Sequence, residues 1–150
     1  MYRSKRFHLI RIILLLSIAL GLSACNSGKV VEPTPQAKPL SQSELEAQYG
    51  LHVNLIAVTA VGGLVDLRLK FVDAEKAKSL LEDPKNYPAL WIEDSKATLN
   101  APEETKAEEI KFEDDGNLFI LYSNPRDTVK PGTPVTIVMG AVRVEPISAK

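Results

Sequence analysis

The stretch Val65-Asp66-Leu67-Arg68-Leu69-Lys70-Phe71 decides the fold of this chain of 150 residues. Apolar side chains occupy every second position of it, and a charged side chain stands at each position between them. Successive side chains of a strand point to opposite faces, so this alternation predicts a β-strand with one face on a core and the other in water.

The preceding segment, residues 51–60, predicts a second strand that is joined to the first through Val61-Gly62-Gly63. Two adjacent glycines supply the positive φ that a tight hairpin turn needs. The apolar positions of this segment change parity between Leu55 and Ile56. A β-bulge, or burial on both faces, explains such a change.

Two short helices are predicted beside these strands. Ser43-Glu44-Leu45-Glu46 has the pattern of a capping box, and Gly50 is a natural helix stop. Residues 73–81 favour a second helix, because Asp73 can cap it and Asp83-Pro84 ends it.

The rest of the chain alternates short apolar runs with turn signals, and it predicts an all-β protein. Strands are expected at 89–92, 97–99, 110–112, 118–122 (compact and buried) and 135–144 (bulged at Gly140), with turns at 114–117 and 130–133. About seven strands in roughly a hundred residues indicate an immunoglobulin-like two-sheet sandwich. Leu-Phe-Ile-Leu-Tyr at 118–122, with the turn and strand that follow, resembles the last two strands of many small extracytoplasmic sandwiches.

The first 24 residues have the order of a signal peptide: basic residues, a short apolar run over 12–20, then small residues. The apolar segment is shorter than the 17 or so residues at the lower limit for a transmembrane helix. Leu22-Ser23-Ala24-Cys25 resembles the lipobox of bacterial lipoproteins, and Cys25 is the only cysteine. The resemblance implies that diacylglycerol is attached to Cys25 and that the chain is cleaved before it. Two or more acyl chains anchor a protein stably to a bilayer.

The chain therefore divides into a signal peptide (1–24), a lipidated cysteine with a disordered proline-rich tether (25–43), and a β-sandwich domain (44–150). Removal of residues 1–24 takes away four basic residues and no acidic one, which leaves 14 Lys and Arg against 19 Asp and Glu. This acidic balance argues against nucleic acid as a partner. We expect a membrane-anchored, extracytoplasmic protein of the cell envelope. Asn26, in place of an aspartate, favours the outer membrane if the source is Gram-negative.

No constellation of residues predicts an enzyme. His52 is the only histidine after residue 24 and lacks the partners of a catalytic triad, so we interpret it as an exposed or locally satisfied strand residue. Neither a zinc nor a copper ligand set is present, and Met139 is expected in the core. We therefore predict no catalytic residues, no metal ligands and no cofactors. Carboxylates pair at Glu103-Glu104 and Glu108-Glu109, and a loop in water is the commoner setting for such pairs.

Trp91 is the only tryptophan, and a core position is its commoner role in sandwiches. The other interpretation is an exposed aromatic for a partner, to which Tyr87 would add surface. The sequence thus predicts a non-catalytic, lipid-anchored envelope module that binds an envelope protein or polysaccharide or serves structurally. The alternative is a small envelope enzyme, or a ligand or ion carrier, that uses carboxylates such as Glu103, Glu108 and Asp114.

Overall fold

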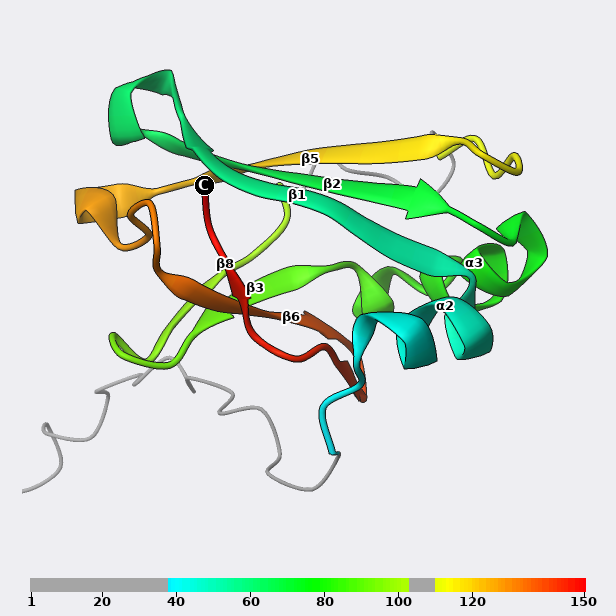
Figure 1. Ribbon diagram of the computed structural model, residues 1–150. Helices are drawn as coiled ribbons and strands as arrows, with labels where there is room; N and C mark the ends of the chain where they lie inside the picture. The colour runs from blue at the N-terminus through cyan, green and yellow to red at the C-terminus, as the bar shows by residue number, and fades with distance from the viewer. Residues whose placement is uncertain (1–37, 103–109) are drawn as a thin grey trace, which may run out of the picture. The chain divides into compact units, whose positions relative to one another are not determined.

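The computed structural model describes residues 38–102 and 110–150, which form two packed antiparallel sheets (Figure 1). The first sheet has the order β1 (Leu51–Thr59), β2 (Leu64–Phe71), β5 (Asn117–Ser123). The second has the order β4 (Ala97–Leu99), β3 (Ala89–Ile92), β6 (Pro134–Met139), β7 (Val142–Arg143), and β8 (Ile147–Ser148) pairs with the start of β6. The predicted all-β sandwich is confirmed, with eight strands in the described residues.

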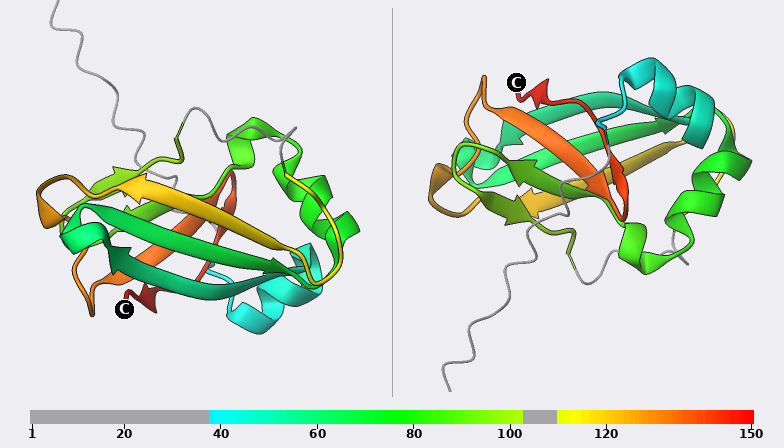
Figure 2. Two further views of the ribbon diagram at one scale, coloured as in Figure 1. Left: turned by 90° about the horizontal axis from the view of Figure 1, so that it is seen from above. Right: turned by 90° about the horizontal axis from the view of Figure 1, so that it is seen from below.

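The order of the strands agrees with that of constant-type immunoglobulin domains except at β4. In constant-type immunoglobulin domains the fourth strand of the chain pairs with the fifth. Here β4 pairs with β3 instead, so the first sheet keeps three strands and β5 lies at its edge (Figure 2).

The core lies between the two sheets, and β2 supplies its centre. Val65, Leu67, Leu69 and Phe71 are all 0% exposed, which confirms the core face predicted for this strand. On the other face Arg68 is exposed as expected, but Asp66 is buried at 9% exposure. β1 pairs with β2 through a register shift between Val53 and Leu55, so the predicted bulge is also confirmed.

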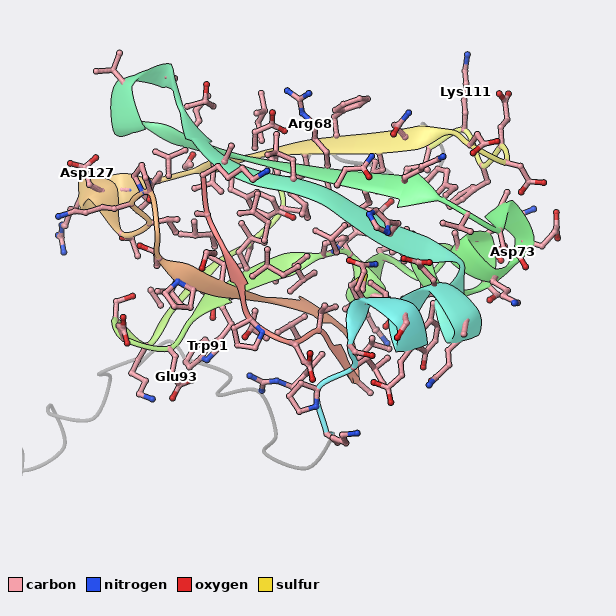
Figure 3. The ribbon with its side chains drawn as sticks, in the orientation of Figure 1. Arg68, Asp73, Trp91, Glu93, Lys111 and Asp127 are labelled. Carbon is pink, nitrogen blue, oxygen red and sulfur yellow. The ribbon has the colours of Figure 1, made fainter. Side chains whose placement is uncertain are left out.

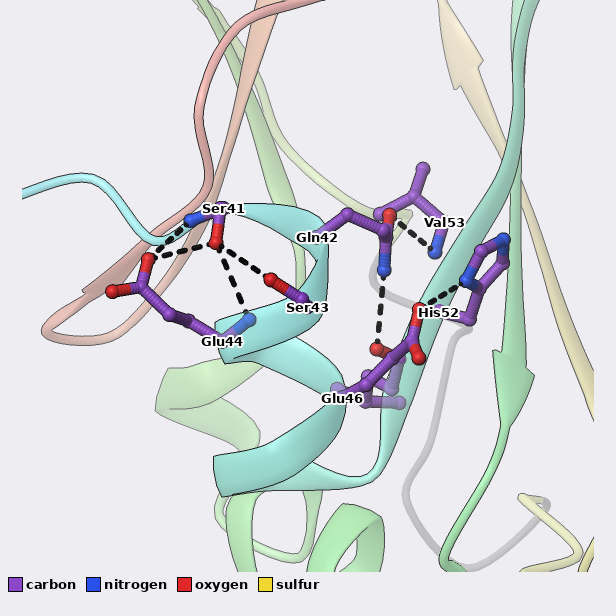
Figure 4. A network of polar contacts seen from close by, with 8 residues as sticks. Ser41, Gln42, Ser43, Glu44, Glu46, His52 and Val53 are labelled. Atoms are coloured by element: carbon purple, nitrogen blue, oxygen red, sulfur yellow. Dashed lines mark hydrogen bonds and ion pairs between the residues drawn. The ribbon is translucent and has the colours of Figure 1, made fainter.

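The first helix, α2 (Gln42–Tyr49), begins two residues earlier than its predicted capping box. Ser41 is the N-cap: its hydroxyl accepts from the N–H of Glu44, and the Glu44 carboxylate accepts from the N–H of Ser41 at 2.8 Å (Figure 4). The predicted box at Ser43 and Glu46 is therefore wrong. Gly50 ends the helix at φ 62°, as expected.

The folded domain also begins before its predicted boundary at residue 44. The Leu40 N–H donates to the carbonyl of Arg143, and the Leu40 carbonyl accepts from the N–H of Glu145. These bonds fix the chain to the strand edge before α2, so residues 40–43 belong to the domain and not to the tether.

The second helix, α3 (Ala74–Leu81), is confirmed. Asp73 caps it by accepting from the N–H of Lys76, and Ala77, Leu80 and Leu81 give it a buried face. Helices α2 and α3 lie together at one end of the sandwich (Figure 2).

Two predictions about turns are wrong. The β1–β2 connection takes positive φ at Ala60, Val61 and Gly62, whereas Gly63 has φ −74°. The strand predicted over 135–144 is two strands, β6 and β7, because Gly140 at φ 59° starts a turn that folds Val142 back onto Met139. The change in the apolar pattern at Gly140 therefore comes from a reversal of the chain, and the expected bulge is wrong.

Two predictions about strands also change. Residues 110–112 form no strand; Phe112 packs instead against Phe71, with ring centroids 5.4 Å apart. Strand β5 was expected to be a compact buried strand, but only one of its faces is buried. Leu118, Ile120 and Tyr122 face the core, but Phe119 is 60% and Leu121 50% exposed.

Candidate functional site

The residues predicted to carry lipid lie outside the described part of the chain. These are Leu22, Ser23 and Ala24 of the lipobox and the attachment residue Cys25. The carboxylates Glu103, Glu104, Glu108 and Glu109 lie outside it too. Within residues 38–102 and 110–150, no helix has the length and apolarity to cross a bilayer.

Trp91 and Tyr87, the predicted aromatic surface, are mostly covered. Trp91 is 5% exposed, so it is buried as expected, but it does not belong to the core cluster between the sheets; its indole N–H donates to Glu93 at 2.8 Å. Leu90 and Ile92 point into the core, so the indole lies on the outer face of β3 (Figure 3). Tyr87 is half-buried. The indole therefore offers little area to a partner.

His52 is satisfied locally, in agreement with its interpretation from the sequence. Its Nδ1 lies 2.6 Å from a carboxylate oxygen of Glu46 on α2, and both side chains are more than a third exposed (Figure 4). Beside this pair, Gln42 of α2 accepts from the N–H of Val53. The contacts fasten α2 to β1. Met139 is 0% exposed and belongs to the core.

Four described carboxylates have a lowered pKa, and in each the main cause is a hydrogen bond from a neighbouring residue. A hydrogen bond from the main-chain N–H of Ser41 lowers the pKa of Glu44, and one from Lys76 lowers the pKa of Asp73. Hydrogen bonds from Lys96 and Trp91 lower the pKa of Glu93, and one from Lys70 lowers that of Asp115. A general acid needs a raised pKa, so these four carboxylates have the opposite tuning.

Asp114 also has a structural partner, although its carboxylate was part of the alternative prediction. Its Oδ1 accepts from the N–H of Ala74 at 2.9 Å, which ties the turn before β5 to the start of α3. In the described residues, no group of three or more His, Cys, Asp or Glu side chains is arranged to hold a metal ion.

The end of the sandwich opposite the helices carries two loops with unusual backbone angles. Ala60 and Val61 after β1, and Arg126 and Asp127 after β5, all have φ between 50° and 58°. Positive φ is costly for a β-branched residue such as Val61, and its side chain is fully exposed. Asp127 lies at this end (Figure 3).

One buried side chain, Asn124 at the end of β5, holds these two loops together. Its amide donates to the carbonyls of Gly62 and Val129, both at 2.8 Å, and accepts from the N–H of Val129 at 2.9 Å. Asn124 is 4% exposed. The bonds explain how the strained loops persist: Asn124 fixes them from inside.

The outer face of the first sheet carries a patch that the sequence did not predict. Arg68 points away from the second sheet (Figure 3). Its Nε and Nη2 donate to a carboxylate oxygen of Asp66 at 2.9 and 2.7 Å. Its guanidinium also lies 5.4 Å from the ring centre of Phe119. Register places further side chains beside this pair. We define the outer patch as Leu55, Ala57, Asp66, Arg68, Phe119 and Leu121.

The outer patch combines exposed apolar groups with an incompletely satisfied acid. Phe119 and Leu121 are two of the four large apolar residues that are strongly exposed in the described chain. Asp66 is 9% exposed, and its Oδ1 is buried without a hydrogen-bond partner among the described residues. Singly exposed apolar residues are ordinary, whereas contiguous exposed apolar surface is a feature of many interaction sites.

Sequence reasoning missed the patch because residues 118–122 are apolar at every position. A period of two cannot be recognised in such a run, so the run predicts a compact buried strand. The missing information was that no described element covers the outer face of the first sheet, so every second side chain of β5 meets water. A search of family models, of curated proteins and of solved structures finds no match to this chain.

Proposed function

We propose that this chain is a lipid-anchored protein of the cell envelope whose β-sandwich is a non-catalytic binding or structural module. The observation that carries the proposal is the segment Leu22-Ser23-Ala24-Cys25, which follows a basic and then a short apolar segment and contains the only cysteine. In this proposal residues 1–24 are removed, and Cys25 carries the acyl chains that hold the module at a membrane.

The contacts of the domain support the non-catalytic part of the proposal. Helix caps and surface ion pairs account for Glu44, Asp73 and Asp115, and the one described histidine is paired with Glu46. The exposed apolar side chains of the outer patch support a role in interaction. An envelope protein or polysaccharide is the candidate partner.

The test is metabolic labelling of the full chain with a radioactive or alkynyl fatty acid in a bacterial host. We expect the wild-type chain to incorporate the label, to fractionate with membranes, and to keep its leader when globomycin inhibits the lipoprotein signal peptidase. Cys25→Ser should abolish both the label and the effect of globomycin.

A matched control moves the cysteine without removing it. The double substitution Cys25→Ser with Ser27→Cys keeps one thiol near the same place but breaks its spacing from Leu22, so it should also remain unlabelled. Label on this variant, or processing of Cys25→Ser that does not differ from wild type, would overturn the lipoprotein proposal. In an enterobacterial host, Asn26→Asp should shift the protein from the outer to the inner membrane.

A further inference from the structure

The edges of the two sheets are protected unequally. The free side of β1 is covered by the chain itself: the N–H of Val58 donates to the carbonyl of Lys150, and the N–H of Lys150 donates to the carbonyl of Ile56. In the second sheet, β4 is three residues long and Leu40 bonds to the far side of β7. Strand β5 is seven residues long and pairs only with β2 among the described residues.

The hydrogen-bond pattern shows which groups of β5 face its open edge. At either end of the β2–β5 ladder, the N–H of Phe71 donates to Gly116, and that of Asn124 donates to Gly63. Hydrogen-bonded pairs recur at every second residue of an antiparallel ladder. Residues 118, 120 and 122 therefore bond to β2, whereas residues 117, 119, 121 and 123 direct their N–H and C=O groups outward.

Within residues 38–102 and 110–150, the open edge lacks the devices that normally prevent pairing. Edge strands are usually protected by a charged side chain, a proline, a bulge, a very short length, or a helix or loop that covers the edge, and no described segment pairs with the free side of β5. Strand β5, Asn-Leu-Phe-Ile-Leu-Tyr-Ser, has no charge and no proline, and its register with β2 is continuous over all seven residues. A second copy of this strand therefore meets no electrostatic repulsion.

We propose that two copies of this chain pair through β5, antiparallel and about a two-fold axis at Ile120, to form a continuous six-stranded sheet. This register overlaps all seven residues and places Phe119 opposite Leu121 of the other copy. The outward N–H and C=O groups of residues 117, 119, 121 and 123 then bond across the axis. Because opposite residues share a face, the exposed side chains of the two outer patches meet in one apolar band.

The charged groups of the outer patch fit this arrangement. Arg68 and Asp66 are the β2 neighbours of Phe119 and Leu121, so the ion pairs of both copies flank the band on either side. The guanidinium that covers Phe119 within each copy remains in place. A strand of seven residues is shorter than the 20–30 residues per side of a standard interface, so we expect a reversible dimer whose population rises with concentration.

The test is the oligomeric state of the full chain, purified in a mild detergent and measured by sedimentation velocity over a hundredfold range of concentration. The wild-type chain should pass from monomer to dimer. Phe119→Glu and Leu121→Lys should each remain monomeric at concentrations where the wild type is dimeric. Val72→Lys is the matched control, since Val72 is 48% exposed but lies outside β5, and it should dimerise like the wild type.

Mixing tests the register. In a two-fold pair centred on Ile120, residue 119 of one copy faces residue 121 of the other. A mixture of the Phe119→Glu and Leu121→Lys chains should therefore recover the dimer that each has lost, and circular dichroism should show that both variants are folded. A wild type that stays monomeric, a dimer that survives both substitutions, or a folded mixture that stays monomeric would overturn the proposal.

These outcomes do not depend on the lipid anchor. Association through the N-terminal segment would persist in Phe119→Glu and Leu121→Lys, because both variants keep that segment. A failure of the dimer therefore leaves the lipoprotein proposal standing, and a failure of Cys25 labelling leaves the dimer proposal standing.

Discussion

The two edges of the first sheet, β1 and β5, differ in how their main-chain groups are used. β1 is bonded on its free side by Lys150 and by the side chain of Gln42. Among the described residues, the free side of β5 has no such partner. The inner face of β5 packs in the core, and Asn124 at its end is hydrogen-bonded to both neighbouring loops. The free side of β5 thus has no main-chain partner in the described part of the chain, which is the difference on which the proposed pairing of two copies rests.

The largest expected effect comes from the end of β5. Asn124→Ala removes three hydrogen bonds to main-chain groups of the two loops, and buried groups left unpaired cost 1–3 kcal/mol each. We expect a loss of about 3 kcal/mol in the free energy of unfolding, measured by chemical denaturation. Asn100→Ala, at an exposed position, should change it by less than about 0.5 kcal/mol. Equal effects would show that Asn124 does not hold the loops.

The covered edge can be opened by one substitution. Lys150→Pro removes the N–H that donates to Ile56 and leaves that carbonyl unpaired, which should lower the free energy of unfolding by about 1.5 kcal/mol. Lys150→Ala keeps the main chain and should match the wild type. Opening β1 should also promote self-association in Phe119→Glu chains, where β5 is blocked. Continued monomeric behaviour of that double variant would mean that side chains alone protect β1.

The inner face of β5 is joined to the second sheet by Tyr122, whose hydroxyl donates to the carbonyl of Pro88 at 2.8 Å in the core. Tyr122→Phe should cost about 1 kcal/mol of unfolding free energy. Burial raises the pKa of Tyr122 far above its ordinary value of 10.0. Since only the unfolded chain then ionises as the pH passes 10.0, wild-type stability should fall above that pH. Tyr122→Phe should fall less steeply in the same denaturation series; an identical slope would assign the loss to other groups.

The open edge should contribute little to the stability of the monomer. Leu121→Thr keeps a good strand former at an exposed position, so the change in unfolding free energy at low concentration should be below about 0.5 kcal/mol. The same variant should weaken the dimer. A large loss of monomer stability would instead show that Leu121 serves the fold of its own chain.

The smallest effects come from the carboxylates at the helix caps. The pKa of Glu44 and that of Asp73 are lowered in the folded state by hydrogen bonds from main-chain N–H groups. A lowered pKa contributes stability above the unfolded value, about 4 for these groups, and this contribution is lost as the pH falls through the folded value. We expect the melting temperature to decline below pH 4, and Glu44→Gln to decline less. If the melting temperatures of the wild type and of Glu44→Gln decline in parallel, Glu44 does not contribute to the loss of stability in acid.

The sequence predicted the parts of the fold in which local pattern and tertiary environment agree. The core face around Leu67, the cap at Asp73 and the stop at Gly50 all have local physical causes, and all three are confirmed. The predictions that failed depend on contacts between distant residues. Residues 110–112 have the composition of a strand, but Phe112 packs against Phe71 instead. The failure at the first helix is different: Ser41 with Glu44 and Ser43 with Glu46 both fit the capping-box pattern, and that pattern alone does not decide that Ser41 is the cap.

The candidate surfaces divide in the same way. Cys25 and its lipobox are a linear motif, so the sequence alone defines the lipoprotein proposal. The sequence alone also predicts the all-β class and its two short helices. The edge position of β5 follows from the pairing of β4 with β3, which is a choice between sheets that no local pattern encodes. Only the tertiary structure places Phe119 and Leu121 in water beside Arg68, because the exposure of a side chain depends on the neighbours that the fold provides.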